Sequence, residues 1–99
     1  MSLPKVKTLD DIYKYYEDEH CCVKYQEVEY ISIPIWYNVY TVLVGDYDIS
    51  FLEIKDIGQK FYRCVDHMGN TYDYNDVNQM FKQLDTLIWN TWELVKRKE

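Results

Sequence analysis

Five side chains in this sequence have the chemistry of soft metal ligands or of a nucleophile with its base. They are His20, Cys21, Cys22, Cys64 and His67. Four such ligands suit a tetrahedral zinc ion, but zinc modules use pairs of ligands separated by a few residues on a tight turn. Cys21 and Cys22 are adjacent, so in a strand they point to opposite faces. We therefore expect neither a metal nor a cofactor.

A cysteine nucleophile would need Cys64 or Cys22 beside His67 or His20. No glycine-rich turn that could supply an oxyanion hole accompanies either cysteine. The sequence therefore predicts a protein that is not an enzyme, in which Cys64 is a small buried apolar residue. An enzyme whose site is invisible in the sequence stays as a second alternative. Three cysteines, two of them adjacent, do not form a disulfide framework.

The charge of the chain is unevenly distributed. It has 17 acidic and 11 basic residues, and a formal net charge of −6. The ends are basic, whereas 16 acidic and 6 basic residues lie between Thr8 and Val95. An acidic body disfavours direct binding of nucleic acid, because phosphate contacts need a basic stripe. It suits a basic protein partner, which long-range attraction would steer to this surface.

Eleven tyrosines in 99 residues indicate strands and a binding surface. We therefore expect a small protein-interaction module, such as an inhibitor, adaptor or regulator. Homodimerisation is part of this hypothesis, because the chain has more large aromatic side chains than one small core can cover. The residues concerned are Trp36, Tyr37, Trp89 and Trp92. The alternative is a DNA mimic that inhibits a nucleic-acid-binding protein, although Lys24, Lys55, Lys60, Arg63 and Lys82 interrupt its acidic surface.

Two groups of residues are candidates for the binding surface. Glu17, Asp18 and Glu19 form an acidic run at the C-terminal end of the first predicted helix, where the helix dipole disfavours negative charge. Trp36 and Tyr37 are neighbouring aromatic residues of the predicted sheet. A charge run is usually a solvated face. The functional alternative for this acidic run is a contact with a basic partner or with the basic C-terminal tail.

The first predicted helix spans about Leu9 to Glu19. Thr8 and Asp11 have the spacing of a capping box, in which each side chain accepts a hydrogen bond from the other residue's backbone. No secretory signal and no run of about 18 apolar residues is visible. These features predict a cytoplasmic protein without membrane contact.

The region from Cys22 to Tyr74 has the alternation of β-strands. Val39 to Val44 is apolar on both faces, as expected for a central strand. Shifts of phase around Pro34 predict a bulge or break. Gly45-Asp46 and residues 56–59 predict turns, and Gly69-Asn70 predicts a two-residue hairpin turn.

The last predicted helix runs from about Asp76 to Arg97, with apolar residues at three- and four-residue spacing. The sequence thus predicts an α+β fold in one domain over residues 1–99. We expect an antiparallel four- or five-stranded meander, with a short N-terminal helix and a long C-terminal helix packed on it. Residues 1–7 are expected to be flexible.

Overall fold

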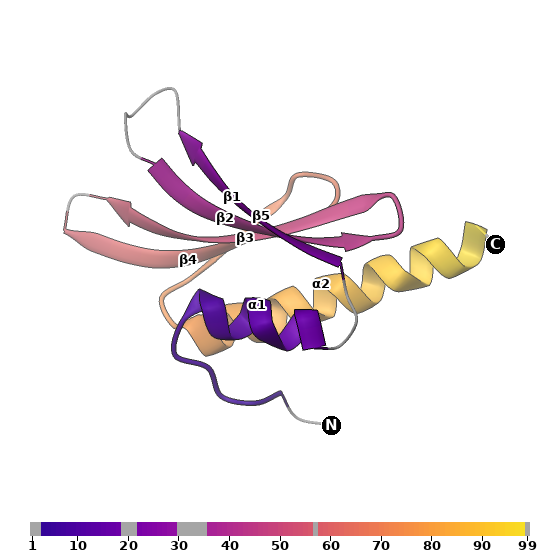
Figure 1. The fold of residues 1–99 in the computed structure, drawn as a ribbon, viewed down its shortest axis with the longest axis horizontal. Coiled ribbons are helices and arrows are strands. Elements are labelled where there is room, and N and C mark those ends of the chain that lie inside the picture. Colours follow the sequence, from indigo (N-terminus) through magenta and orange to yellow (C-terminus); the bar gives the residue numbers. More distant parts are fainter. Residues whose placement is uncertain (1–2, 19–21, 30–35, 57, 99) are drawn as a thin grey trace.

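Two helices flank five consecutive strands along the chain. The computed structural model describes residues 3–18, 22–29, 36–56 and 58–98 (Figure 1). The elements are α1 (Leu9–Asp18), β1 (Cys22–Glu29), β2 (Trp36–Val44), β3 (Tyr47–Asp56), β4 (Gln59–Val65), β5 (Thr71–Tyr74) and α2 (Val77–Lys98). Both helices lie on the same side of the sheet, which confirms the predicted α+β architecture.

The strands form one antiparallel sheet in the order β1-β2-β3-β4-β5. Each strand pairs with its neighbour in the sequence, so the predicted meander is confirmed with five strands. β2 lies between β1 and β3, and its Val42 and Val44 are fully buried, as expected for a central strand. The predicted bulge or break around Pro34 lies outside the described residues.

The hairpin between β4 and β5 differs from the prediction of a two-residue turn at Gly69-Asn70. Val65 pairs with Thr71, so residues 66–70 connect the two strands. The amide of Asp66 donates to the carbonyl of Asn70 at 3.0 Å, and the amide of Gly69 donates to the carbonyl of Asp66 at 3.1 Å. The second of these hydrogen bonds closes a β-turn over residues 66–69, in which Gly69 has the left-handed φ of 88°. The longer turn forms in place of the predicted two-residue turn because Asp66 closes it with these hydrogen bonds.

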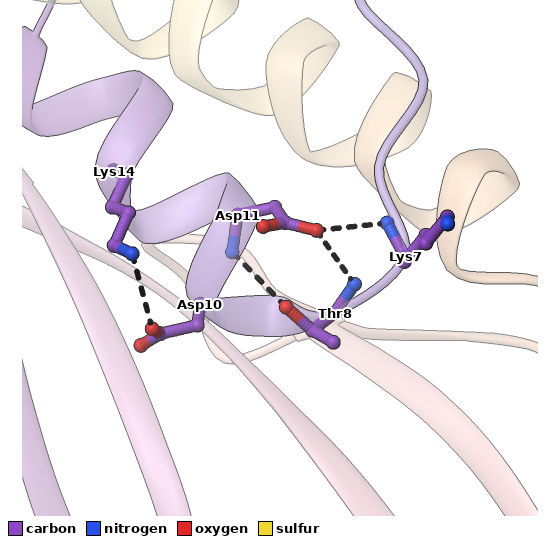
Figure 2. Close-up of polar contacts among 5 residues, drawn as sticks. All are labelled: Lys7, Thr8, Asp10, Asp11 and Lys14. Atoms are coloured by element: carbon purple, nitrogen blue, oxygen red, sulfur yellow. Dashed lines mark hydrogen bonds and ion pairs between the residues drawn. The ribbon is translucent and has the colours of Figure 1, made fainter.

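The start of α1 is the predicted capping box (Figure 2). The amide of Asp11 donates to Oγ1 of Thr8 at 3.3 Å, and the amide of Thr8 donates to Oδ2 of Asp11 at 3.1 Å. The amide of Lys7 donates to the same carboxylate at 3.0 Å. The backbone hydrogen bonds from Lys7 and Thr8 hold the pKa of Asp11 below its ordinary value. Lys14 lies 3.9 Å from Asp10, but both are exposed and the pair contributes little.

α2 provides the largest part of the core from the helical side. Asp76 caps it, because its Oδ1 accepts from the amide of Asn78 at 3.4 Å. Of the positions predicted from spacing, Trp92 and Val95 are partly buried, and the others are buried: Val77, Met80, Phe81, Leu84, Leu87, Ile88 and Thr91. The hydroxyl of Thr91 donates to the carbonyl of Leu87 at 2.7 Å, so its burial leaves no unpaired polar group.

The sheet buries apolar residues on both faces. The face under the helices contributes Tyr40, Val42, Val44, Ile49, Phe51, Tyr62 and Cys64 to the main core. Tyr40 stacks on Phe51 with ring centroids 5.0 Å apart. Leu52 and Ile54 point to the opposite face and are also buried, with Val39 and Phe61 packed against them. The second cluster is therefore already covered and is not an open apolar surface.

The chain before α1 lies on the side of the helices that faces away from the sheet (Figure 1). Asn78 of α2 holds this segment with two hydrogen bonds: its Oδ1 accepts from the amide of Val6 at 2.8 Å, and its Nδ2 donates to the carbonyl of Val6 at 3.0 Å. The side chain of Val6 is buried. Flexibility of residues 1–7 stays a prediction, but these contacts tie the C-terminal part of the segment to α2.

Candidate functional site

The acidic run of the sequence lies at the C-terminal end of α1. Glu17 is exposed in the last turn, Asp18 is the last residue of the helix, and Glu19 lies outside the described residues. The last turn of α1, residues 15–18, contains no basic residue. The carboxylate of Glu17 and the negative end of the helix dipole therefore add to one another at this point of the surface.

Trp36 and Tyr37 lie elsewhere. They are the first residues of β2 and pair with Glu29 and Val28 at the far end of β1. β1 begins at Cys22, soon after α1 ends, so its length separates the two groups by roughly 23 Å. The structure therefore does not bring the two halves of the predicted binding surface together.

Contacts between aromatic residues fix the end of α1 against α2. The hydroxyl of Tyr16 donates to Oδ1 of Asp85 at 2.9 Å. The rings of Tyr15 and Tyr16 both meet Phe81 edge to face, with centroids 5.3 and 5.9 Å apart. The ring of Tyr13 lies 5.6 Å from that of Tyr40 on the sheet. The acidic end of α1 is thus held beside Asp85, near the middle of α2.

Together with partial burial, the Glu17 carboxylate raises the pKa of Tyr13, its neighbour one turn earlier on α1. Partial burial raises the pKa of Tyr13, and the charge of Glu17 together with a hydrogen bond between the two side chains raises it further. Tyr13 therefore stays protonated and can donate to Glu17. This contact orients the carboxylate on the exposed side of the helix without neutralising its charge.

α2 continues well beyond the end of α1 (Figure 1). α1 has 10 residues and α2 has 22, so α2 is longer by roughly 18 Å. Trp89 lies on this projecting half, one turn after Asp85, and is 60% exposed. It is followed one turn later by Glu93, whose carboxylate lies 3.8 Å from the ammonium group of Lys96. An exposed tryptophan therefore stands on the part of α2 that extends beyond the end of α1.

Sequence reasoning placed Trp89 on or beside the apolar face of α2 and gave it a binding role only as one of four aromatic residues that suggest homodimerisation. The sequence did contain a sign that Trp89 is exposed. Trp89 directly follows the periodic apolar positions Leu87 and Ile88 and does not itself belong to their spacing. We call the exposed residues Trp89 and Glu93 of α2, which lie beyond the end of α1, the α1-end surface.

A groove of about 910 Å³ lies next to this surface, between the N-terminal segment and α2. Its lining residues are Leu3, Pro4, Lys5, Asp76, Asn78, Phe81, Lys82, Asp85 and Thr86. Its apolar residues are Leu3, Pro4 and Phe81, of which Phe81 is buried, and its charged residues are two lysines and two aspartates. Thr86 and Trp89 are three residues apart on α2, so the groove and the α1-end surface are contiguous.

The titratable groups at the β4–β5 hairpin are engaged in turn structure. The carboxylate of Asp66 accepts hydrogen bonds from the amides of Met68 and Asn70, both at 2.9 Å, and from the hydroxyl of Tyr72 at 3.2 Å. Burial of Asp66 raises its pKa, but these hydrogen bonds outweigh burial and the net shift is downward. Asp66 therefore stays ionised and holds the hairpin.

Cys64 is not placed as a nucleophile. Its side chain is fully buried, and burial together with the charges of Asp73 and Asp66 raises the pKa of the thiol to about 12. The ring of His67 meets Tyr47 edge to face at 5.0 Å. Of the five candidate ligands, His20 and Cys21 lie outside the described residues. Within the described ranges, no group of three or more His, Cys, Asp or Glu side chains is placed to hold a metal ion.

Ion pairs give the described surface mixed signs. Lys60 lies 3.4 Å from Glu53, and Arg63 forms a bidentate pair with Asp73 at 2.7 and 3.0 Å. Two exposed pairs on the helices add to this pattern. A DNA mimic needs rows of unpaired carboxylates, so the pairs favour a protein-interaction surface over mimicry.

Comparison with protein-family models, with curated proteins and with solved structures finds no match to this chain. In the described part of the chain, no helix is both long and apolar enough to cross a membrane.

Proposed function

We propose that this protein is a small non-enzymatic interaction module that binds a basic protein partner through the α1-end surface. The observation that carries the proposal is the exposure of Trp89 on the part of α2 that extends beyond α1. Trp89 is 60% exposed, although α2 otherwise buries its large apolar residues against the sheet. Tryptophan is one of the residues that most often dominate the energy of protein interfaces.

Charge supports a basic partner. Glu17 and Asp18 stand at the negative end of α1 without a cation in the same turn, and the body of the chain is strongly acidic. Such a surface attracts a basic partner over long range and raises its association rate. The indole face of Trp89 also attracts cations, since the ring quadrupole presents negative charge. Aromatic and electrostatic attraction therefore select the same class of partner.

The test is affinity capture from the source cell with wild-type protein and with Trp89→Ala as baits. Met68→Ala is the matched control, because among the residues that the structure describes Met68 is the other exposed large apolar residue, at 77%, and it lies on the β4–β5 turn. We expect a basic protein to be retained by the wild type and by Met68→Ala, to be lost from Trp89→Ala, and to elute as the salt concentration rises.

Capture of the same proteins by Trp89→Ala and wild type would contradict the proposal. Light scattering distinguishes a second copy of the chain from a different partner. A concentration-dependent dimer that disappears in Trp89→Ala would show that this surface joins two copies instead.

A further inference from the structure

Asn78 of α2 holds the N-terminal segment (residues 3–7) by its backbone. The side-chain amide of Asn78 accepts from the N–H of Val6 at 2.8 Å and donates to the C=O of the same residue at 3.0 Å. In an antiparallel sheet, a residue of the neighbouring strand makes the same pair of hydrogen bonds. Asn78 therefore binds an extended backbone, whatever side chain the bound residue carries.

The side chains of the segment add selectivity to this backbone contact. Val6 is buried in the main core cluster, and Leu3, three residues earlier, packs against the same cluster. Pro4 and Lys5 between them are exposed. Pro4 favours an extended backbone at itself and at Leu3, and an extended chain with three residues per turn places positions i and i+3 on one side. The contact therefore suits an extended segment with apolar residues three positions apart.

The segment is attached by fewer contacts than the helices beneath it. Residues 3–7 precede α1 and belong to no helix or strand (Figure 1). A segment with few buried contacts opens at a lower free energy than the whole domain. The two helices keep their own contacts when it opens, since Tyr16 bonds to Asp85 and its ring meets Phe81. Opening therefore uncovers Asn78 and the position of Val6 on helices that stay packed.

We propose that α2 binds an extended segment of another protein at Asn78, and that the chain's own N-terminal segment occupies this site as an intramolecular competitor. The partner's segment has the pattern seen here: two apolar residues three positions apart, the second of which pairs with the Asn78 amide. This inference goes beyond the proposed function, because Asn78 lies roughly 16 Å along α2 from Trp89, at 1.5 Å per residue. The partner reaches the site only in molecules whose own segment is open, so its apparent affinity falls in proportion to the open fraction.

The test is binding of a fluorescent peptide with the sequence of residues 3–8 to the full-length protein, measured by anisotropy. Val6→Ala and Val6→Asp weaken the protein's own segment to increasing degrees, because the first shortens a buried apolar side chain and the second would bury a charge. Lys5→Ser is the matched control, since Lys5 is exposed in the same segment. A peptide with aspartate in place of its valine is the control ligand. Circular dichroism checks that each variant keeps its helices and sheet.

We expect the peptide affinity to rise from wild type to Val6→Ala to Val6→Asp, by about tenfold or more in the last, because more molecules are open. The Lys5→Ser protein should bind as the wild type does. Asn78→Asp in the Val6→Asp background keeps the acceptor but removes the donor, and it should lower this affinity about tenfold. Trp89→Ala should leave the affinity unchanged, which separates this site from the α1-end surface.

Four results would overturn the proposal. Equal peptide affinity for wild type and both Val6 variants would show that the segment does not compete for the site, and no detectable binding to any variant would show that the site takes no second segment. Equal binding of the valine and aspartate peptides would overturn the recognition of an apolar residue. A wild-type dimer in light scattering that disappears in Val6→Asp would assign the site to the N-terminal segment of a second copy. All four leave the proposed function standing, because none involves Trp89.

Discussion

Gly45, in the turn between β2 and β3, lies directly against Val95 near the end of α2. A Cβ atom on Gly45 would come within 2.9 Å of Cγ2 of Val95, and Gly45 has φ 63°. Both the left-handed backbone and the contact therefore require glycine. This contact joins the projecting half of α2 to the sheet, and so it supports the helix on which Trp89 stands.

Gly45→Ala is expected to destabilise the protein by more than Gly58→Ala does. Gly58 has φ 72° but nothing within 4 Å of its Cβ position, so its substitution costs only the left-handed backbone, about 1–2 kcal/mol. Gly45→Ala adds the clash with Val95. Urea unfolding measures both, and Val95→Ala in the Gly45→Ala background should recover part of the difference. Equal losses at the two glycines would show that the turn does not press on α2.

Leu84→Ala should cost about 2–5 kcal/mol, because Leu84 is fully buried in the middle of α2 and its truncation leaves a cavity. Asn90→Ala, at an exposed position of the same helix, should change stability by no more than about 0.5 kcal/mol. Chemical denaturation of both variants measures the difference. Similar stabilities for the two would mean that the apolar face of α2 is not packed on the sheet.

Stability should fall as pH drops below about 4. The pKa values of Asp11 and Asp66 are lowered in the folded protein, so the unfolded chain binds more protons than the folded one in this range. The stabilisation is present above the unfolded pKa and is lost as pH falls through the folded pKa. Asp11→Asn and Asp66→Asn should each reduce the difference in unfolding free energy between pH 6 and pH 3. Carboxyl titrations by NMR that give ordinary midpoints would contradict the assignment.

The thiol of Cys64 should resist alkylation in the native protein. Its pKa is raised to about 12, chiefly by burial, so it holds almost no thiolate at pH 8. Iodoacetamide should label the Cys64 peptide only after addition of denaturant, as read by mass spectrometry. Rapid labelling of Cys64 under native conditions would show that β4 opens to solvent.

Neutralising the acidic end of α1 should leave the melting temperature level or raise it. Glu17→Gln, Asp18→Asn and Glu19→Gln remove negative charges from the end of a helix where the dipole disfavours them. The same triple change should slow association with a basic partner and weaken its salt dependence. A marked fall in stability would instead assign the acidic run a structural role.

Several features of the fold follow from short stretches of sequence. The capping box needs only Thr8 and Asp11, which are three residues apart and hydrogen-bond to each other's backbone. The buried face of α2 follows from the three- and four-residue spacing of its apolar residues, which is the repeat of any α-helix. The α+β class follows from the order of the helical and strand patterns along the chain. Each of these depends on interactions within a few positions of the chain, where propensity and spacing act directly.

The turn at residues 66–70 shows where local reading was insufficient. Gly69-Asn70 has the composition of a two-residue turn, but the pairing of Val65 with Thr71 and the hydrogen bonds to Asp66 select a longer one. Register depends on the whole hairpin, so it was not decided by the turn residues alone.

The candidate site was decided by tertiary structure. Sequence identified the acidic residues and the surplus of aromatic ones as two groups of candidates, and the length of β1 holds Trp36 and Tyr37 apart from the acidic run. The helical repeat gives the direction of Trp89 around α2, but its exposure depends on what packs there. The hydrogen bond between Tyr16 and Asp85 joins the two helices across 69 positions, which no local pattern predicts. Burial and adjacency of distant residues are properties of packing between elements, which no local pattern contains.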